Sequence, residues 1–320
     1  MSLEVGLTIE GQEGVSWPQW LDLARVAEEH GFVGLYRSDH YLSEHSGSNR
    51  DALDAWGTIC GLAAVTSKIR LGTLVSPITF RHPSVLAKLA VTAEHISNGR
   101  VDVGIGAGWY LDEHIAYGFD LPDQRTRFEM LEEQLEILTR AWAPEPFSFH
   151  GRHYRLDHND ARPKPTRTRP RLTLGGSGGP RSLDLAANWA DEYNVAAGAA
   201  EVIRGHGNAL ASACERRDRD PATLALSVLA GVACGRDQSE IEERAARVCR
   251  FLGYEFTSPS TAIAALPTEW LIGTPEEVAR QLGDLESLGV ARVILWPPLH
   301  DDLEMVDLIG SEVLPAIVSH

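Results

Sequence analysis

Strand-like and helix-like patterns alternate along almost the whole chain. Short apolar runs, typical of parallel strands buried on both faces, are separated by stretches in which apolar residues recur every three or four positions. The runs predicted as strands are residues 5–9, 32–36, 69–75, 100–106, 171–174, 193–195, 224–232 and 292–296. Eight strands alternating with helices predict one domain over residues 1–320, an α/β fold of the TIM (β/α)8 barrel type. A doubly wound open sheet is the alternative that the same alternation allows.

Helices are predicted over residues 18–29, 52–66, 83–97, 128–142, 181–189 and 199–217, from residue 275, and near the C-terminus. The apolar residues of the third helix recur at helical spacing and are predicted to face the core: Leu86, Leu89, Ala93 and Ile96. Asn98-Gly99 then favours the left-handed backbone that ends helices.

Two segments, about residues 144–170 and 253–270, lie outside the alternation and are predicted as loop insertions. Directly after the second, Thr274 and Glu277 form a capping-box pattern at the start of a late helix. The insertions are the places where this barrel is expected to differ from a bare one.

The charge and composition of the chain narrow its partners. A net charge of −16 argues against nucleic acid or an anionic membrane as a partner, and it mainly supports solubility. No apolar run reaches the roughly 20 residues that a membrane-spanning helix needs. The cysteines are scattered without a C-x-x-C pair. We therefore expect a cytoplasmic protein.

One basic stretch departs from this acidic balance. It lies in a proline-rich region and contains Arg162, Lys164, Arg167, Arg169 and Arg171. It is either a solvated loop or an electropositive rim for the anionic tail of a ligand.

Glycines at alternate positions end the fourth predicted strand, in the segment Gly104-Ile105-Gly106-Ala107-Gly108, and Trp109 and Tyr110 follow. Glycine lets the backbone come close to a flat ligand because it has no Cβ. The spacing is not the Gly-x-Gly-x-x-Gly of a dinucleotide-binding Rossmann turn, and it lies far from the first strand. The segment predicts a strand end that faces a planar molecule.

Asp39-His40 ends the second predicted strand, and barrel active sites lie at the carboxyl ends of the strands. An aspartate beside a histidine can fix its tautomer or favour its charged form, which suits proton transfer near neutral pH. The alternative is a capping aspartate with a loop histidine.

The turn Gly175-Gly176-Ser177-Gly178-Gly179 precedes a helix, so its N–H groups could bind a phosphate. The alternative is a plain flexible turn. No metal-ligand spacing and no Gly-x-Ser-x-Gly nucleophile motif is present. Together these features predict a barrel that binds a planar, phosphate-bearing molecule opposite a proton-handling pair.

The chain resembles the luciferase-like monooxygenase superfamily, whose members use FMN or the deazaflavin coenzyme F420. The resemblance is carried by residues 34–40, 70–83, 97–109, 174–179 and 273–278. The Ser-Asp-His end of the second strand and the Gly-Trp after the fourth are most similar to the F420-dependent branch.

This resemblance implies hydride transfer between F420 and an unidentified small organic substrate, with His40 handling the proton and Asp39 orienting it. It places a non-prolyl cis peptide at Leu74–Val75, against the cofactor ring. The cofactor-binding residues that it implies are Leu74, Val75, Ser76, Gly106, Ala107, Gly108, Trp109, Gly175, Gly176, Ser177, Gly178 and Gly179.

Two alternatives stay open. One is an FMN-dependent monooxygenase that uses reduced flavin and O2, and the other is a non-catalytic flavin-binding protein. The basic stretch favours F420, which carries a polyglutamate tail. Glu44 stands where the sugar-phosphate dehydrogenases of the family have a tryptophan, which argues against glucose 6-phosphate as the substrate. A homodimer is expected, since dimers are the commonest oligomers.

Overall fold

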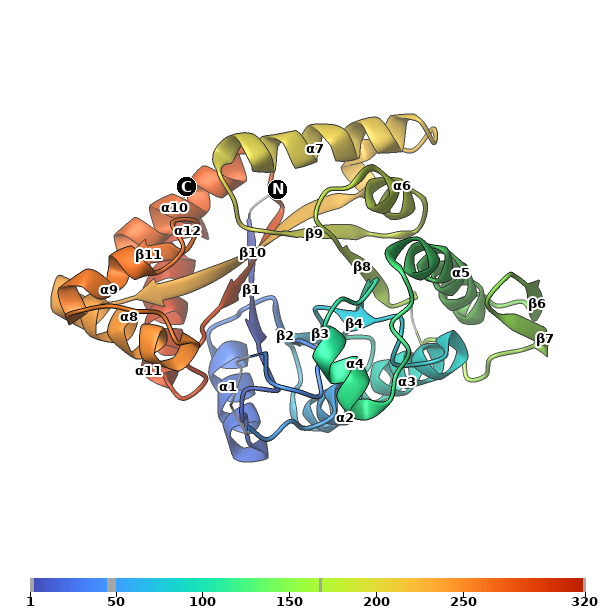
Figure 1. Ribbon diagram of the computed structural model, residues 1–320, viewed down its shortest axis with the longest axis horizontal. Coiled ribbons are helices and arrows are strands. Elements are labelled where there is room, and N and C mark those ends of the chain that lie inside the picture. The colour runs from blue at the N-terminus through green and yellow to red at the C-terminus, as the bar shows by residue number, and fades with distance from the viewer. Residues whose placement is uncertain (1–2, 45–49, 167–168, 319–320) are drawn as a thin grey trace.

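Parallel strands close into a barrel in the computed structural model, which describes residues 3–44, 50–166 and 169–318 (Figure 1). The order around the barrel is β12, β1, β2, β3, β5, β8, β9 and β10, and β10 pairs with both β9 and β12, so the sheet has no free edge. Their bounds are β1 (Glu4–Ile9), β2 (Gly34–Arg37), β3 (Arg70–Thr73), β5 (Val101–Gly106), β8 (Arg171–Gly175), β9 (Glu192–Ala196), β10 (Ala225–Cys234) and β12 (Arg292–Trp296). The predicted barrel is confirmed, and the open sheet is excluded.

Helices surround these strands (Figure 1). Those following the strands are α1 (Trp17–Glu29), α2 (Ala55–Val65), α3 (Pro83–Ser97), α5 (Gln124–Trp142), α6 (Pro180–Trp189), α7 (Ala200–Glu215), α8 (Gln238–Leu252), α10 (Pro275–Ser287), α11 (Leu303–Leu308) and α12 (Leu314–Val318). A π-helical turn over Ile309–Val313 joins the last two. Helix α8 was not predicted from the sequence. No helix of the described residues is long and apolar enough to cross a membrane.

The predicted ends of α3 and α10 are confirmed. Asn98 ends α3 in the left-handed region, with φ 58°, and Thr274 and Glu277 form the capping box of α10. The predicted inner face of α3 is partly wrong, because Ile96 is 45% exposed. This helix buries Ala90 and Ser97 instead, so its core-facing stripe is rotated away from Ile96.

Several short strands and helices lie outside the eight-stranded barrel. The first predicted insertion contains the hairpin of β6 (Phe147–His150) and β7 (Arg155–Asn159), which Figure 1 shows beyond α5. The second contains α9 (Pro259–Ala265), followed by β11 (Leu271–Gly273) beside the end of β10. At the carboxyl end, β4 (Ser76–Pro77) continues β3, and α4 (Leu111–Tyr117) follows β5. The remaining short element is a 3-10 turn over Pro221–Thr223.

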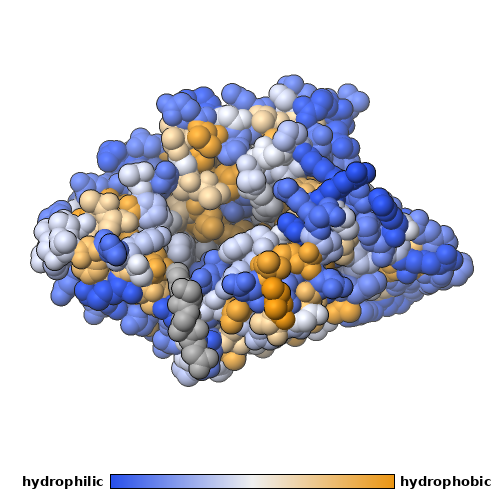
Figure 2. All heavy atoms as spheres, viewed as in Figure 1, coloured by the Kyte–Doolittle hydropathy of each residue, from blue (hydrophilic) through white to orange (hydrophobic). Residues whose placement is uncertain are grey.

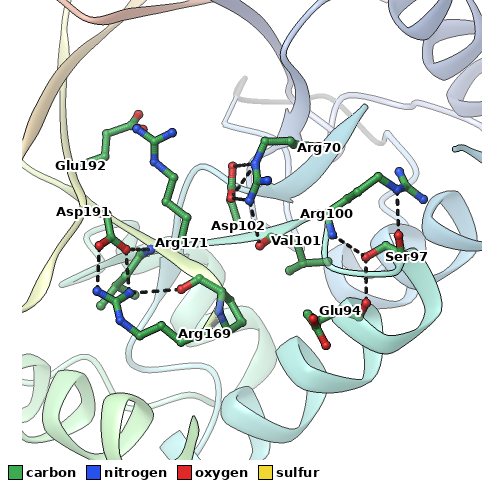
Figure 3. A network of polar contacts seen from close by, with 12 residues as sticks. Arg70, Glu94, Ser97, Arg100, Val101, Asp102, Arg169, Arg171, Asp191 and Glu192 are labelled. Carbon is green, nitrogen blue, oxygen red and sulfur yellow. Dashed lines mark hydrogen bonds and ion pairs between the residues drawn. The ribbon is translucent and has the colours of Figure 1, made fainter. Parts of the chain in front are cut away.

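A network of ion pairs lies at the amino end of the barrel. Arg292 of β12 is almost fully buried, and its Nη1 lies 3.2 Å from Glu192 Oε2. Arg171 Nη2 lies 3.1 Å from the same oxygen, and Arg70 binds Asp102 (Figure 3). These charges stand on the first or second residues of their strands, so they lie at the pole of the barrel opposite the glycine turns.

Arg169 and Arg171 of the basic stretch lie at this pole, away from the glycine turns, where they line a cavity of about 800 Å³. A role of the stretch as a rim for a ligand tail stays a prediction. Arg169 binds Asp191 at 2.6 Å, and Arg171 binds Glu192 (Figure 3). Arg162 pairs with Asp160. Arg167 lies outside the described residues. The local sequence shows that basic residues are clustered, but it does not show at which end of the barrel they lie.

Candidate active site at the carboxyl end of the barrel

Two adjoining cavities open at the carboxyl ends of the strands. The larger has a volume of about 730 Å³ and the smaller about 220 Å³. Both are lined by Leu74, Val75, Gly108 and Trp109, so they meet at the end of β3 and the turn after β5. Figure 2 shows this face hollowed at its centre, beside an apolar patch over α4.

Most of the predicted cofactor-binding residues line the larger cavity: Leu74, Val75, Gly106, Ala107, Gly108, Trp109, Gly175, Gly176, Ser177 and Gly179. Gly178 lines neither cavity, and neither does Ser76. Ser76 is buried, and its hydroxyl donates to Asp39 Oδ2 at 2.6 Å. Alternation explains this outcome, since neighbouring extended residues point to opposite sides.

The peptide bond between Leu74 and Val75 is cis, as the family resemblance implies. The glycines around this bond make room for Val75. A Cβ on Gly106 would lie 2.8 Å from Val75 Cγ2, and one on Gly175 would lie 3.1 Å from Val75 Cγ1. The strand glycines therefore let the bulge at Val75 project into the barrel mouth and form the shared floor of the two cavities.

The glycine turn after β8 has both bound and free N–H groups. Gly178 has φ +78°, and its N–H donates to the Tyr193 hydroxyl at 2.9 Å. The N–H of Gly176 donates to the carbonyl of Asn194. In the described part of the chain the N–H groups of Ser177 and Gly179 have no protein acceptor. They lie at the start of α6, where the helix dipole favours an anion.

Three arginines also line the larger cavity: Arg125 and Arg127 of α5, and Arg181 of α6. The Nε atom of Arg127 is buried without a hydrogen-bond partner, although its Nη1 donates to the carbonyl of Pro122. Arg181 lies over the Phe128 ring. Sequence reasoning missed this group because α5 and α6 meet only in the fold. The available signal was the pair Arg125 and Arg127 at the start of the helix that follows the glycine segment.

His40 lines the smaller cavity and lies between two carboxylates. Its Nδ1 is 2.8 Å from Glu113 Oε1, and its Nε2 is 3.3 Å from Glu44 Oε1. Burial alone would lower the pKa of His40, but the hydrogen bond and charge of Glu113, helped by Glu44 and Glu10, raise it to about 9. His40 is therefore an imidazolium at neutral pH.

Asp39 does not orient His40, contrary to the prediction. Its carboxylate is fully buried and faces Arg81, whose Nη2 lies 3.1 Å from Asp39 Oδ1. The orienting residue is Glu113, whose other oxygen accepts from the N–H of Tyr41 at 2.8 Å. Glu113 lies 73 residues after His40. Only the packing of α4 against the end of β2 brings them together.

Comparison with known proteins agrees with this architecture. The family model described as luciferase-like monooxygenase matches residues 3–292. An F420-dependent glucose-6-phosphate dehydrogenase of Nakamurella multipartita is 28% identical and aligns over 92% of this chain and 91% of its own length. The structure is similar to an F420-dependent secondary alcohol dehydrogenase in complex with an F420-acetone adduct, with a TM-score of 0.83, 21% identity and 99% of each chain covered. It is equally similar, at 15% identity, to a riboflavin lyase with modified FMN, over 100% of this chain and 92% of that one. The chain belongs to the luciferase-like monooxygenase family.

Proposed function

We propose that this protein is an F420-dependent oxidoreductase that acts on a small organic substrate without anionic groups. The observation that carries the proposal is the pair of cavities that share the floor at Val75. The larger cavity offers free N–H groups and arginines, and the smaller cavity offers a histidine bound to a carboxylate. Relatives over most of the chain are named F420-dependent dehydrogenases.

The larger cavity fits a deazaflavin bearing a phosphate and an acidic tail. Val75 would support the ring, the N–H groups of Ser177 and Gly179 would bind the phosphate, and Arg127 and Arg181 would attract the tail. The bound coenzyme supplies the hydride exchange. The chain orients the ring, and His40 donates or accepts the proton that accompanies the hydride.

The smaller cavity is unsuited to an anionic substrate. Its lining includes the carboxylates of Glu10, Glu44 and Glu113, and no lysine or arginine of the described residues lines it. Like charges about 4–6 Å apart repel by a few kcal/mol near a protein surface. We therefore propose a neutral or cationic substrate. This agrees with Glu44, which stands where the sugar-phosphate dehydrogenases of the family have a tryptophan.

Turnover measurements can test this substrate class. With F420 as the coenzyme, kcat/KM for an uncharged alcohol or carbonyl compound should exceed that for its phosphorylated counterpart by on the order of 100-fold, because three acidic side chains in the cavity lining outnumber the single cation of its described residues, His40. Replacing Glu10 with glutamine should narrow this preference, since one carboxylate is removed. A preference for the phosphorylated compound would contradict the proposal.

The FMN-dependent monooxygenase stays the second candidate, because the riboflavin lyase structure shows that this fold also accompanies FMN. A non-catalytic role is disfavoured by the charged histidine that faces the smaller cavity. The cytoplasmic location and the homodimer stay predictions. The free state of all four cysteines supports the former.

A further inference from the structure

When Glu44 and Glu113 are both ionised, they favour a proton on each ring nitrogen of His40. Glu113 Oε1 lies 2.8 Å from Nδ1 and Glu44 Oε1 lies 3.3 Å from Nε2. A neutral imidazole has one N–H and one lone pair, so it would turn a lone pair toward one carboxylate. The proton on Nδ1 is committed to Glu113. The proton on Nε2 is the one that His40 can exchange.

The two carboxylates differ in their surroundings. The Glu113 side chain is 1% exposed and is also held by the N–H of Tyr41, so it stays in place as a fixed partner. The Glu44 side chain is 35% exposed. Glu44 lines the smaller cavity beside His40 and Glu10, so it contacts both Nε2 and water.

We propose that Glu44 is the proton carrier between Nε2 of His40 and solvent. This inference rests on the proposed function, because a hydride reaction needs a matching proton. In the reducing direction the substrate gains a hydride on carbon from the bound coenzyme and a proton on its heteroatom from Nε2. The neutral imidazole then takes a proton from the Glu44 carboxyl, which takes one from water. In the oxidising direction each transfer runs backwards.

The charges around Glu44 suit this role. Burial raises the pKa of Glu44, the charge of His40 lowers it, and the carboxylates of Glu10, Glu13 and Glu113 raise it again, to about 7. The Glu13 carboxylate is itself paired with Arg50. A carboxyl group that titrates near neutral pH can both give and take a proton at the working pH.

Glu10 is a weaker candidate for the same role. Its Oε2 accepts a hydrogen bond from Gln12 Nε2 at 2.8 Å, and neither a hydrogen bond nor an ion pair joins Glu10 to His40 in the described part of the chain. Glu44 is thus the cavity-lining acid that touches the exchangeable nitrogen, at the position where the sugar-phosphate dehydrogenases of the family have a tryptophan.

A pH titration of the protein labelled with ¹⁵N-histidine tests the inference without coenzyme or substrate. The ring signals of His40, assigned by their loss in His40→Gln, should show two inflections, near pH 7 from Glu44 and near pH 9 from the imidazolium. In Glu44→Gln the lower inflection should vanish and the pKa of His40 should fall by about 1, because an opposite charge is removed. Asp112→Asn, which changes an exposed acid of α4, is the matched control and should leave both inflections in place. A single His40 titration near pH 6.5, or one unchanged by Glu44→Gln, would overturn the inference.

Steady-state kinetics separate this inference from the proposed function. Glu44→Gln should lower kcat by about 10²-fold and remove the inflection near pH 7 from the kcat profile, while coenzyme affinity stays unchanged. A Glu44→Gln profile that retains this inflection would contradict the carrier role, whatever its kcat. Failure of the wild-type protein to bind F420 would refute the proposed function instead, and the histidine titration would still decide whether Glu44 and His40 share a proton.

Discussion

Replacing His40 with asparagine is expected to lower turnover by about 10²–10⁴-fold, the usual contribution of a positioned general acid or base. Asparagine keeps an N–H donor for Glu113, which lies 2.8 Å from Nδ1 in the wild type, but removes Nε2. The larger cavity is not lined by His40, so the Kd for F420 should change by less than about twofold. Steady-state kinetics and a coenzyme titration measure the two quantities. Full turnover in this variant would refute the role of His40.

The pH dependence of the wild-type reaction rates should follow the titration of His40. Reduction needs the imidazolium, so its rate should fall as the pH rises through about 9, and oxidation, which needs the neutral ring, should rise over that range. The pKa of His40 is raised in the folded protein above its usual 6.5. Its pairing with Glu113 therefore stabilises the fold fully below about pH 6.5, and this contribution is lost as the pH rises through 9. In Glu113→Gln the fall of the reduction rate and the rise of the oxidation rate should both move to lower pH, because the pKa of His40 is lowered.

Replacing Arg292 with methionine is expected to destabilise the fold by about 3–5 kcal/mol, because three carboxylates, two of them buried, are then left with two arginines, Arg70 and Arg171, instead of three. The guanidinium binds Glu4 through Nε at 2.8 Å, and it lies beside the nearly inaccessible Glu192 and Asp102. It also donates to the Tyr36 hydroxyl at 2.9 Å. Methionine fills a similar volume, so the loss reports the charge rather than a cavity. Urea-induced unfolding measures the free energy of unfolding.

Arg280→Met is the matched control for Arg292. Arg280 pairs with Asp284 on the surface of α10, with side chains 66% and 69% exposed. Such pairs contribute about 0–1 kcal/mol, so this variant should unfold almost as the wild type does. Equal losses in both variants would show that the buried network does not hold the amino end of the barrel together.

Much of the barrel could be predicted because buried parallel strands are nearly continuous apolar runs. The bounds of β12 and α3 agree with the prediction, since both carry strong local end signals. Helix α8 was missed because its residues are mostly charged, with apolar positions such as Ile241 and Val248 spread thinly along it. Local pattern is weak there, and packing against the barrel decides the structure.

The parts of the site that lie in one short segment could be predicted from the sequence. The contacts between side chains that are distant in the sequence could not. The glycine turn at residues 175–179 and the cis bond at Leu74–Val75 are local features, and both lie where they were expected. The partner of His40 was assigned to the adjacent Asp39, but consecutive extended residues point to opposite sides. Glu113 reaches His40 only through the packing of α4.

The measurement that tests the account most directly is a fluorescence titration of the purified protein with F420 and, separately, with FMN. We expect F420 to bind at least about tenfold more tightly, because the arginines of the larger cavity face an acidic tail that FMN lacks. Arg127→Met should weaken the binding of F420 more than that of FMN, since the tail would lose a partly buried cation. Tighter binding of FMN, with no change of F420 affinity in Arg127→Met, would contradict the account.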